Sequence, residues 1–230
     1  MRRTKAYLKP HRFYRVQHLK KSGWVSFQVC CRETDLWIRA RQDLSKEALQ
    51  VVMNVRRQIE LYIAAHPEFL TALDPLPQDA LAPGIVRRML TAAASAGVGP
   101  MASVAGAVAQ AVAEALKPVS PEIIVENGGD CYFDLGESIQ VGLFAGPDSP
   151  FSGRLGLRLG RERFPLAICT SSATVGHSLS FGKVDAAVVL SKDASLADAA
   201  ATAMGNLVGS ARDIQMALDH AKSMPAVEAA

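Results

Sequence analysis

The chain has 230 residues, of which 49% are hydrophobic and 20% charged, so it can bury a full core like an ordinary globular protein. This composition excludes a disordered or fibrous protein, and a formal net charge of +3 is too small to indicate nucleic-acid binding. Eight of the 25 lysine and arginine residues lie in the first 21 positions, before the first acidic residue, Glu33. This basic stretch could contact a phosphate-bearing partner, and a solvated arm is the default interpretation.

The four cysteines show no zinc-binding spacing, which favours a reduced compartment. No apolar run follows the basic N-terminus, so a secretory signal is not indicated. Residues 89–113 are uncharged and long enough to span a membrane, but they consist mostly of alanine and glycine, with Pro100 in the middle. We therefore expect a cytoplasmic protein without a membrane-spanning segment.

The N-terminal part reads as strands followed by a helix. Residues 12–19 and 24–40 alternate aromatic or β-branched residues with polar ones, and a turn at residues 33–35 makes the second stretch a β-hairpin. A helix is predicted from Asp43 or Ser45 to about Ala65. Residues 74–84 then form a proline-rich connection.

Two further helices are predicted in the middle of the chain. The first covers residues 85–94, and a break at Gly97, Gly99 and Pro100 precedes an alanine-rich helix that ends at about Leu116. Its small residues suit close packing inside one chain or across a homodimer interface.

The C-terminal half begins with four apolar segments, in residues 122–136, 138–147, 154–160 and 165–172, which predict an antiparallel meander. A strand over 185–190 leads into a helix over 196–208 with Gly209 at its C′ position. A second helix over 212–222 precedes a tail that we expect to be dispensable. The whole chain is predicted to be one α+β domain, with a hairpin-and-helix portion (1–83), a core (84–210) and a C-terminal helix and tail (211–230).

Asp198 and Thr202 are four residues apart on a predicted helix, so a carboxylate and a hydroxyl lie on the same face. Two hard oxygen donors placed in this way suit Mg²⁺, which also takes water and phosphate oxygens as ligands. The alternative is that Ser195 and Asp198 form a capping box at the start of the helix.

A second candidate site follows the strand that ends in Thr170-Ser171-Ser172. Three hydroxyls and a small-residue loop through Gly176 suit a phosphate, although a strand end with ordinary turn chemistry is an equal alternative. His177 follows directly, with a pKa near neutrality that suits a phosphate donor or a general base, and a structural histidine is the alternative.

A third candidate is Asn127-Gly128-Gly129-Asp130, which follows an apolar strand. The paired glycines permit either close approach of a ligand or a plain hairpin turn.

Taken together, VENGGD, the strand leading into Thr170, the following His177 and SLADAAAT resemble the ApbE superfamily, whose characterised members are FAD:protein FMN transferases. The likeness covers about residues 95–209 and is closest to an uncharacterised ApbE-like branch, through GVGPMASVAGA, GHSLSFGKVDAAVV and ASLADAAATAMGN. In the transferases a segment of the form Ala-Asp-Ala-x-x-Thr binds the divalent metal. The resemblance therefore implies that Asp198 and Thr202 hold Mg²⁺.

Other transferase motifs correspond in part. Their strand-end Thr-Ser-Gly becomes Thr170-Ser171-Ser172, and their Gly-Gly-Asp turn corresponds to Gly128-Gly129-Asp130. Their His-x-x-Asp-Pro loop becomes His177 followed by Ser178, Leu179, Ser180 and Phe181, so the aspartate and the proline are absent.

The resemblance implies an ApbE-like (T-fold-like) domain with a mainly antiparallel sheet and packed helices. It also implies a phosphorylated ligand, FAD or FMN, bound with Mg²⁺. The phosphate would be held by Thr170, Ser171, Ser172 and His177, and His177 would be the catalytic proton carrier. Two alternatives remain: a non-catalytic ligand-binding or assembly protein on the same fold, and a reaction on another anionic metabolite. We expect no nucleic-acid partner.

Overall fold

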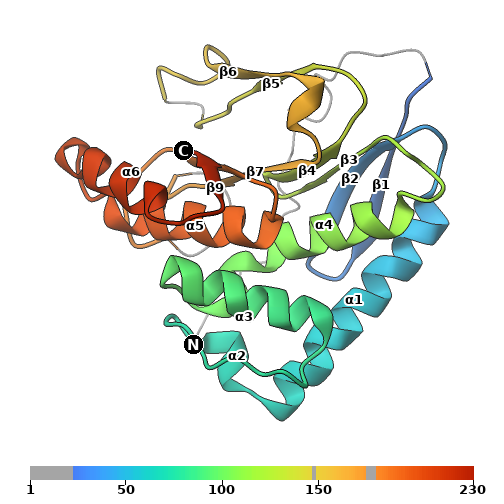
Figure 1. Cartoon of the computed structure of the whole chain (residues 1–230), viewed down its shortest axis with the longest axis horizontal. Coiled ribbons are helices and arrows are strands. Elements are labelled where there is room, and N and C mark those ends of the chain that lie inside the picture. Colours follow the sequence, from blue (N-terminus) through green and yellow to red (C-terminus); the bar gives the residue numbers. More distant parts are fainter. Residues whose placement is uncertain (1–22, 147–148, 175–179) are drawn as a thin grey trace, which may run out of the picture.

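The computed structural model describes residues 23–146, 149–174 and 180–230. In these ranges an antiparallel sheet carries helices on one face and a two-stranded ribbon on the other (Figure 1). The predicted α+β fold with a mainly antiparallel sheet is confirmed. The predicted strand over residues 12–19 and the basic arm lie outside the described residues.

The main sheet has seven strands in the order β1-β2-β3-β4-β7-β8-β9, and every neighbouring pair is antiparallel. Because side chains alternate along a strand, Ile38 and Val125 pack under the helices, whereas Ile124 and Ile168 pack under the ribbon. The strands are β1 (Val25–Cys31), β2 (Thr34–Ala40), β3 (Ile123–Asn127), β4 (Asp130–Asp134), β7 (Leu166–Ser171), β8 (Ala187–Ser191) and β9 (Val227–Ala229).

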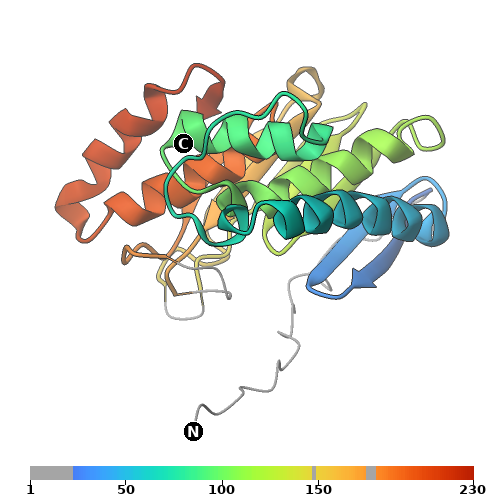
Figure 2. The same ribbon diagram turned by 90° about the horizontal axis from the view of Figure 1, so that it is seen from below.

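The helices cover one face of this sheet, as the view from below shows (Figure 2). Helices α4 and α5 lie directly on the strands, and α3 packs on both of them. The predicted helices are confirmed, whereas α2 was missed because four residues are too few for a periodic pattern. The helices are α1 (Ser45–Ala65), α2 (Glu68–Thr71), α3 (Gly84–Ala96), α4 (Val104–Leu116), α5 (Ala194–Leu207) and α6 (Ile214–Lys222), with short 3₁₀ turns η2 (Pro100–Ser103), η3 (Arg161–Arg163) and η4 (Ala211–Asp213).

The predicted meander is wrong at two segments. Strand β4 pairs with β7, while β5 (Ile139–Gly142) and β6 (Gly156–Leu159) pair with each other as a separate ribbon. The outer face of the sheet presents apolar side chains such as Ile124 and Phe133, and Val141 and Leu157 of the ribbon pack against them. The need to cover this second face explains why the ribbon leaves the sheet.

The C-terminal tail is also different from the expectation. Residues Val227–Ala229 form β9 on the edge of the sheet beside β8, and Ser191 Oγ donates to Ala226 O at 2.8 Å. The tail is therefore part of the fold rather than dispensable. Gly209 does stand at the C′ position after α5, but it is not among the residues with positive φ.

Among the described residues, no single helix has the length and apolarity of a membrane span. The segments Gly84–Ala96 and Pro100–Leu116 meet that test only as a pair, which is bent by 104°.

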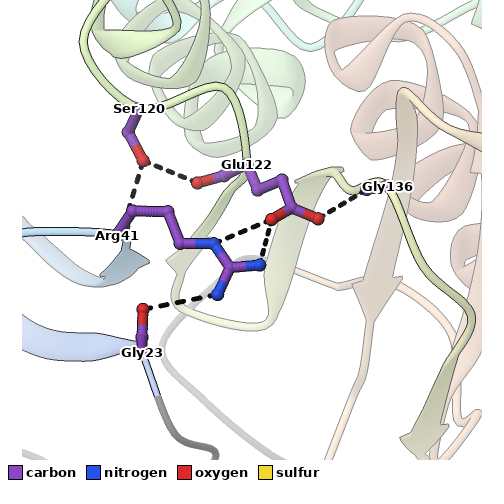
Figure 3. A network of polar contacts seen from close by, with 5 residues as sticks. All are labelled: Gly23, Arg41, Ser120, Glu122 and Gly136. Atoms are coloured by element: carbon purple, nitrogen blue, oxygen red, sulfur yellow. Dashed lines mark hydrogen bonds and ion pairs between the residues drawn. The ribbon is translucent and has the colours of Figure 1, made fainter.

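A polar network joins the β1–β2 hairpin to the start of β3 (Figure 3). The guanidinium of Arg41 donates to Glu122 Oε2 through Nε at 2.7 Å and through Nη2, and to Gly23 O at 3.3 Å. Glu122 Oε1 accepts from Gly136 N at 2.8 Å, and Ser120 Oγ bridges Arg41 N and Glu122 O. One carboxylate thus ties three separate backbone segments together.

Replacing Glu122 with alanine is expected to lower the free energy of unfolding by about 1–3 kcal/mol, because Gly136 N loses its acceptor and Arg41 loses its charged partner. Glu122→Gln keeps an oxygen acceptor and should cost about half as much. Chemical denaturation measures both values. Equal losses in the two variants would contradict a role for the remaining acceptor.

Candidate functional site

A cavity of about 320 Å³ opens between the N-terminal end of α4 and the side of α5. This volume is at the lower end of the ~300–1,000 Å³ common for small-molecule sites. Three of the predicted site residues line it together: Asp130, Asp198 and Thr202. The other lining residues are Leu70, Thr71, Ala72, Leu73, Val98, Gly99, Met101, Ala102, Val104, Ala105, Phe181 and Asn206.

Helix α5 presents Asp198 and Thr202 to the cavity, and its N-terminus is capped by another residue. Asp193 Oδ1 accepts from Ser195 N at 2.8 Å and from Leu196 N at 3.2 Å. The capping box proposed between Ser195 and Asp198 is therefore wrong. Since Asp193 satisfies the first turn, Asp198 is available for another role.

Asp198 instead contacts helix α4. Its Oδ2 accepts from Gly106 N at 2.9 Å, in the first turn of α4, which has no side-chain cap of its own. The contact is reciprocal, because Gln110 Oε1 of α4 accepts from Ala194 N at the start of α5 at 2.7 Å. Each helix therefore caps the N-terminus of the other, which fixes Asp198 at the cavity wall.

Removal of the Gln110 acceptor should loosen this arrangement. Gln110→Ala leaves the buried Ala194 N without its partner, and we expect a loss of about 1–3 kcal/mol in the free energy of unfolding. Gln110 Nε2 donates to Glu114 Oε1 at 2.8 Å, so Gln110→Glu is combined with Glu114→Gln, which retains an oxygen at the same reach without placing two carboxylates in contact, and this variant should lose less. Thermal and chemical denaturation of the two variants test this, and an unchanged Gln110→Ala protein would exclude the proposed cap.

Asp130 reaches the cavity from the start of β4. The residue is 7% exposed, and its Oδ1 accepts from Thr170 N at 3.1 Å. Burial raises the pKa of Asp130 to about 7, which the Thr170 N–H opposes and the charge of Glu126 reinforces. Burial, and then the charge of Asp130, also raises the pKa of Asp198 well above its ordinary value. Two acidic groups are thus held close together in a site that disfavours their charges.

Gly128 and Gly129 form the two-residue turn between β3 and β4, with φ values of 73° and 119°. Positive φ at both positions is typical of a tight hairpin turn. Neither glycine lines the cavity. The turn positions Asp130 at the cavity, and Asp130 is the residue of the predicted Asn127-Gly128-Gly129-Asp130 motif that lines it.

The predicted phosphate-binding hydroxyls lie at the end of β7, and none of them lines the cavity. Thr170 is two residues after Ile168 on β7, so the two side chains lie on the same face of the sheet. Because Ile168 packs under the ribbon, the Thr170 side chain lies on the face opposite the helices. It serves the site through its backbone N–H. Ser172 Oγ accepts from Thr174 N at 3.1 Å, as in a local turn. Gly176 and His177 lie outside the described residues.

The sequence did not predict several of the residues that line the cavity. Asn206 is one turn beyond Thr202 on α5, and this spacing could have identified it. Phe181 and residues 70–73 come from segments without a periodic pattern, so only the folded structure brings them to the site.

The donors at the cavity suit a magnesium ion. Two carboxylates and one hydroxyl are hard oxygen ligands, and Mg²⁺ commonly takes one or two carboxylates and completes its shell with water and phosphate oxygens. A cation would also relieve the repulsion between Asp130 and Asp198. Across the described ranges, no group of three or more His, Cys, Asp and Glu side chains could hold a metal.

The chain is similar to known proteins over most of its length. The model of a family described as AbpE bacteria matches residues 16–226. A UPF0280 protein of Methanocella arvoryzae is 44% identical over 200 residues, which is 86% of this chain and 81% of that protein. UPF0280 protein MJ1526 of Methanocaldococcus jannaschii is 41% identical over 186 residues, which is 80% of this chain and 75% of the relative.

The fold is similar to a solved structure. The apo form of the Pseudomonas stutzeri flavinyl transferase ApbE matches with a TM-score of 0.55, over 86% of this chain and 88% of that chain. The sequence identity is 11%, so the likeness concerns the fold alone. This is the fold that the sequence motifs implied.

Proposed function

The chain belongs to the AbpE bacteria family, and from this premise we propose that it binds a flavin nucleotide, FAD or FMN, together with Mg²⁺ in the cavity lined by Asp130, Asp198 and Thr202. The observation that carries the proposal is the meeting of these three oxygen-bearing residues in one cavity. The fold adds support, because the Pseudomonas stutzeri protein of similar fold is a flavinyl transferase.

Each residue has a distinct role in this proposal. Asp198 and Thr202 hold the metal, and the α4 N–H groups fix the orientation of the Asp198 carboxylate. Asp130 adds a second carboxylate, oriented by the Thr170 N–H. The bound Mg²⁺ neutralises the charge of the phosphate groups. Leu70, Leu73 and Phe181 contribute an apolar part of the lining.

Flavin transfer is the finer proposal. In it, His177 takes the proton of a threonine hydroxyl of a target protein, the hydroxyl oxygen forms a bond to the FMN phosphorus of FAD, and the pyrophosphate bond breaks so that AMP leaves. A specific sequence feature favours the alternative of a binding protein without transfer activity: Ser180 and Phe181 stand where the transferases carry aspartate and proline after their histidine. Fold likeness does not decide between these two activities.

Titration with FMN and FAD, followed by flavin fluorescence with and without Mg²⁺, tests the binding proposal. We expect binding that requires the metal. Absence of binding by the intact protein in both conditions would overturn the proposal. Mass spectrometry of a threonine-containing acceptor peptide after incubation with FAD and Mg²⁺ then distinguishes the two activities, since FMN-labelled peptide would exclude the non-catalytic alternative.

A further inference from the structure

Three large apolar side chains remain exposed where the cavity opens. Leu70 is 52% exposed, Leu73 57% and Phe181 62%, and all three line the cavity. We call these three side chains the apolar rim. Their exposure contributes little to folding, because most of their surface stays in water. They adjoin the polar side chains of Asp130, Asp198 and Thr202 in the same cavity.

The leucine side of the rim is held in place by a close backbone contact. Leu70 belongs to α2, and Ala72 N donates to Glu68 O at 2.8 Å as the helix ends. A Cβ atom at Gly99 would lie 1.8 Å from Ala72 O, so only glycine permits this approach. The segment that carries both leucines is therefore held against the backbone at Gly99, which precedes α4.

The segment that carries Phe181 is hydrogen-bonded to the C-terminal end of α5. Phe181 N donates to Asn206 Oδ1 at 2.9 Å, and Lys183 N donates to Val208 O at 2.8 Å. Between them, a Cβ atom at Gly182 would lie 1.8 Å from Gly205 O. Two hydrogen bonds and one close contact thus hold the backbone that carries an exposed aromatic ring at the cavity.

We propose that Phe181, with Leu70 and Leu73, determines specificity by holding the flat aromatic ring of the ligand, and that Asn206 is the residue that positions Phe181. This inference rests on the proposed function for the anionic part of the ligand, which binds beside Asp198 through the metal. Leu70, Leu73 and Phe181 line the same cavity as the residues that would hold the metal, so a ligand whose phosphate binds there places its ring against the apolar rim. Planar rings stack favourably on aromatic side chains.

The test compares a ligand that has a ring with one that has none. Affinities for FMN, for AMP and for inorganic pyrophosphate are measured calorimetrically with Mg²⁺. Phe181→Ala should weaken binding of the ring-bearing ligands by about 10-fold and leave pyrophosphate binding unchanged, since stacking on one aromatic side chain is typically worth about that factor. Phe181→Trp should retain ring binding. Phe151→Ala is the matched control, because Phe151 is 58% exposed and does not line the cavity.

The positioning role of Asn206 needs its own readout. Asn206→Ala should reproduce part of the ring-specific loss, and Asn206→Asp, which keeps an oxygen acceptor for Phe181 N, should restore the ratio of FMN to ribose 5-phosphate affinity, because these two monophosphates respond alike to the added charge. A general loosening of the site would instead weaken all ligands equally and leave this ratio unchanged in both variants. That result would overturn the positioning role.

The outcomes separate this inference from the proposed function. Metal-dependent FMN binding that is unaffected by Phe181→Ala would show that the apolar rim does not hold the ring, while the proposed flavin site would remain supported. Phe181-dependent binding of AMP without FMN binding would support the rim and exclude flavin. If neither FMN nor AMP binds to the intact protein, both proposals are wrong.

Discussion

Asp198→Asn is expected to weaken Mg²⁺-dependent ligand binding at least about 10-fold without destabilising the metal-free protein. Asparagine keeps a side-chain oxygen that can accept from Gly106 N, so the cap on α4 survives. The substitution also removes a carboxyl group whose pKa is raised by burial and by Asp130, which means that its charged form is unfavourable in the folded state. We therefore expect the metal-free variant to be as stable as the wild type or more stable.

Ligand affinity should respond in the opposite direction. A neutral amide is a much weaker ligand for Mg²⁺ than a carboxylate, so ligand affinity with metal present should fall by at least about 10-fold, ~1.4 kcal/mol. Asp198→Ala should show the same loss of binding and, in addition, a lower stability than Asp198→Asn, because the α4 N–H groups lose their acceptor. Flavin titration and chemical denaturation of the same samples measure the two effects.

Asp193→Ala provides the matched control on the same helix. Asp193 caps α5 and does not line the cavity, so its removal should cost about 1 kcal/mol of stability while the response to Mg²⁺ stays intact. Metal-dependent binding that persists in Asp198→Asn would contradict the metal role and leave Asp198 as a helix cap alone.

Local patterns were sufficient for most helices and strands. The hairpin of β1 and β2, helix α1 and the break before α4 follow from alternation, amphipathic periodicity, glycine and proline. The position of the β5–β6 ribbon did not follow, because strand pairing depends on which distant apolar face needs cover. The pairing of β9 with β8 is likewise a contact between segments far apart along the chain.

The candidate site shows the same division. The spacing of Asp198 and Thr202 on one helix predicted two cavity residues, and the Gly128-Gly129 turn delivers Asp130 as the third. The interaction that orients Asp198 links residues 92 positions apart in sequence, so no local motif could indicate it. The capping box was wrong for a local reason, since Asp193, two residues before Ser195, is an equally good cap and caps the helix instead.

In the absence of metal, the protein is expected to lose stability as the pH rises from about 4 to about 7. The pKa of Asp130 is 3.8 in its reference state and about 7 in the folded protein. The folded state therefore binds more protons than the unfolded state in this interval, so the free energy of unfolding falls with increasing pH, and the stabilising contribution of protonated Asp130 is lost above about 7. The raised pKa of Asp198 acts with the same sign. The lowered pKa values of Glu33 and Asp79 act oppositely, but their effect is confined to more acidic solution.

Magnesium should reverse this loss, because a bound cation favours both charged carboxylates. The pH-dependent loss is on the order of 2–4 kcal/mol, which corresponds to roughly 5–10 °C in Tm for a chain of this size. Thermal unfolding at pH 5 and pH 8 should therefore show a much larger Mg²⁺-induced rise in Tm at pH 8. Asp130→Asn retains an acceptor for Thr170 N and should flatten the metal-free pH profile. An equal response to Mg²⁺ at both pH values would show that these carboxylates do not bind the cation. A wild-type metal-free profile in Asp130→Asn would show that Asp130 does not carry the pH dependence.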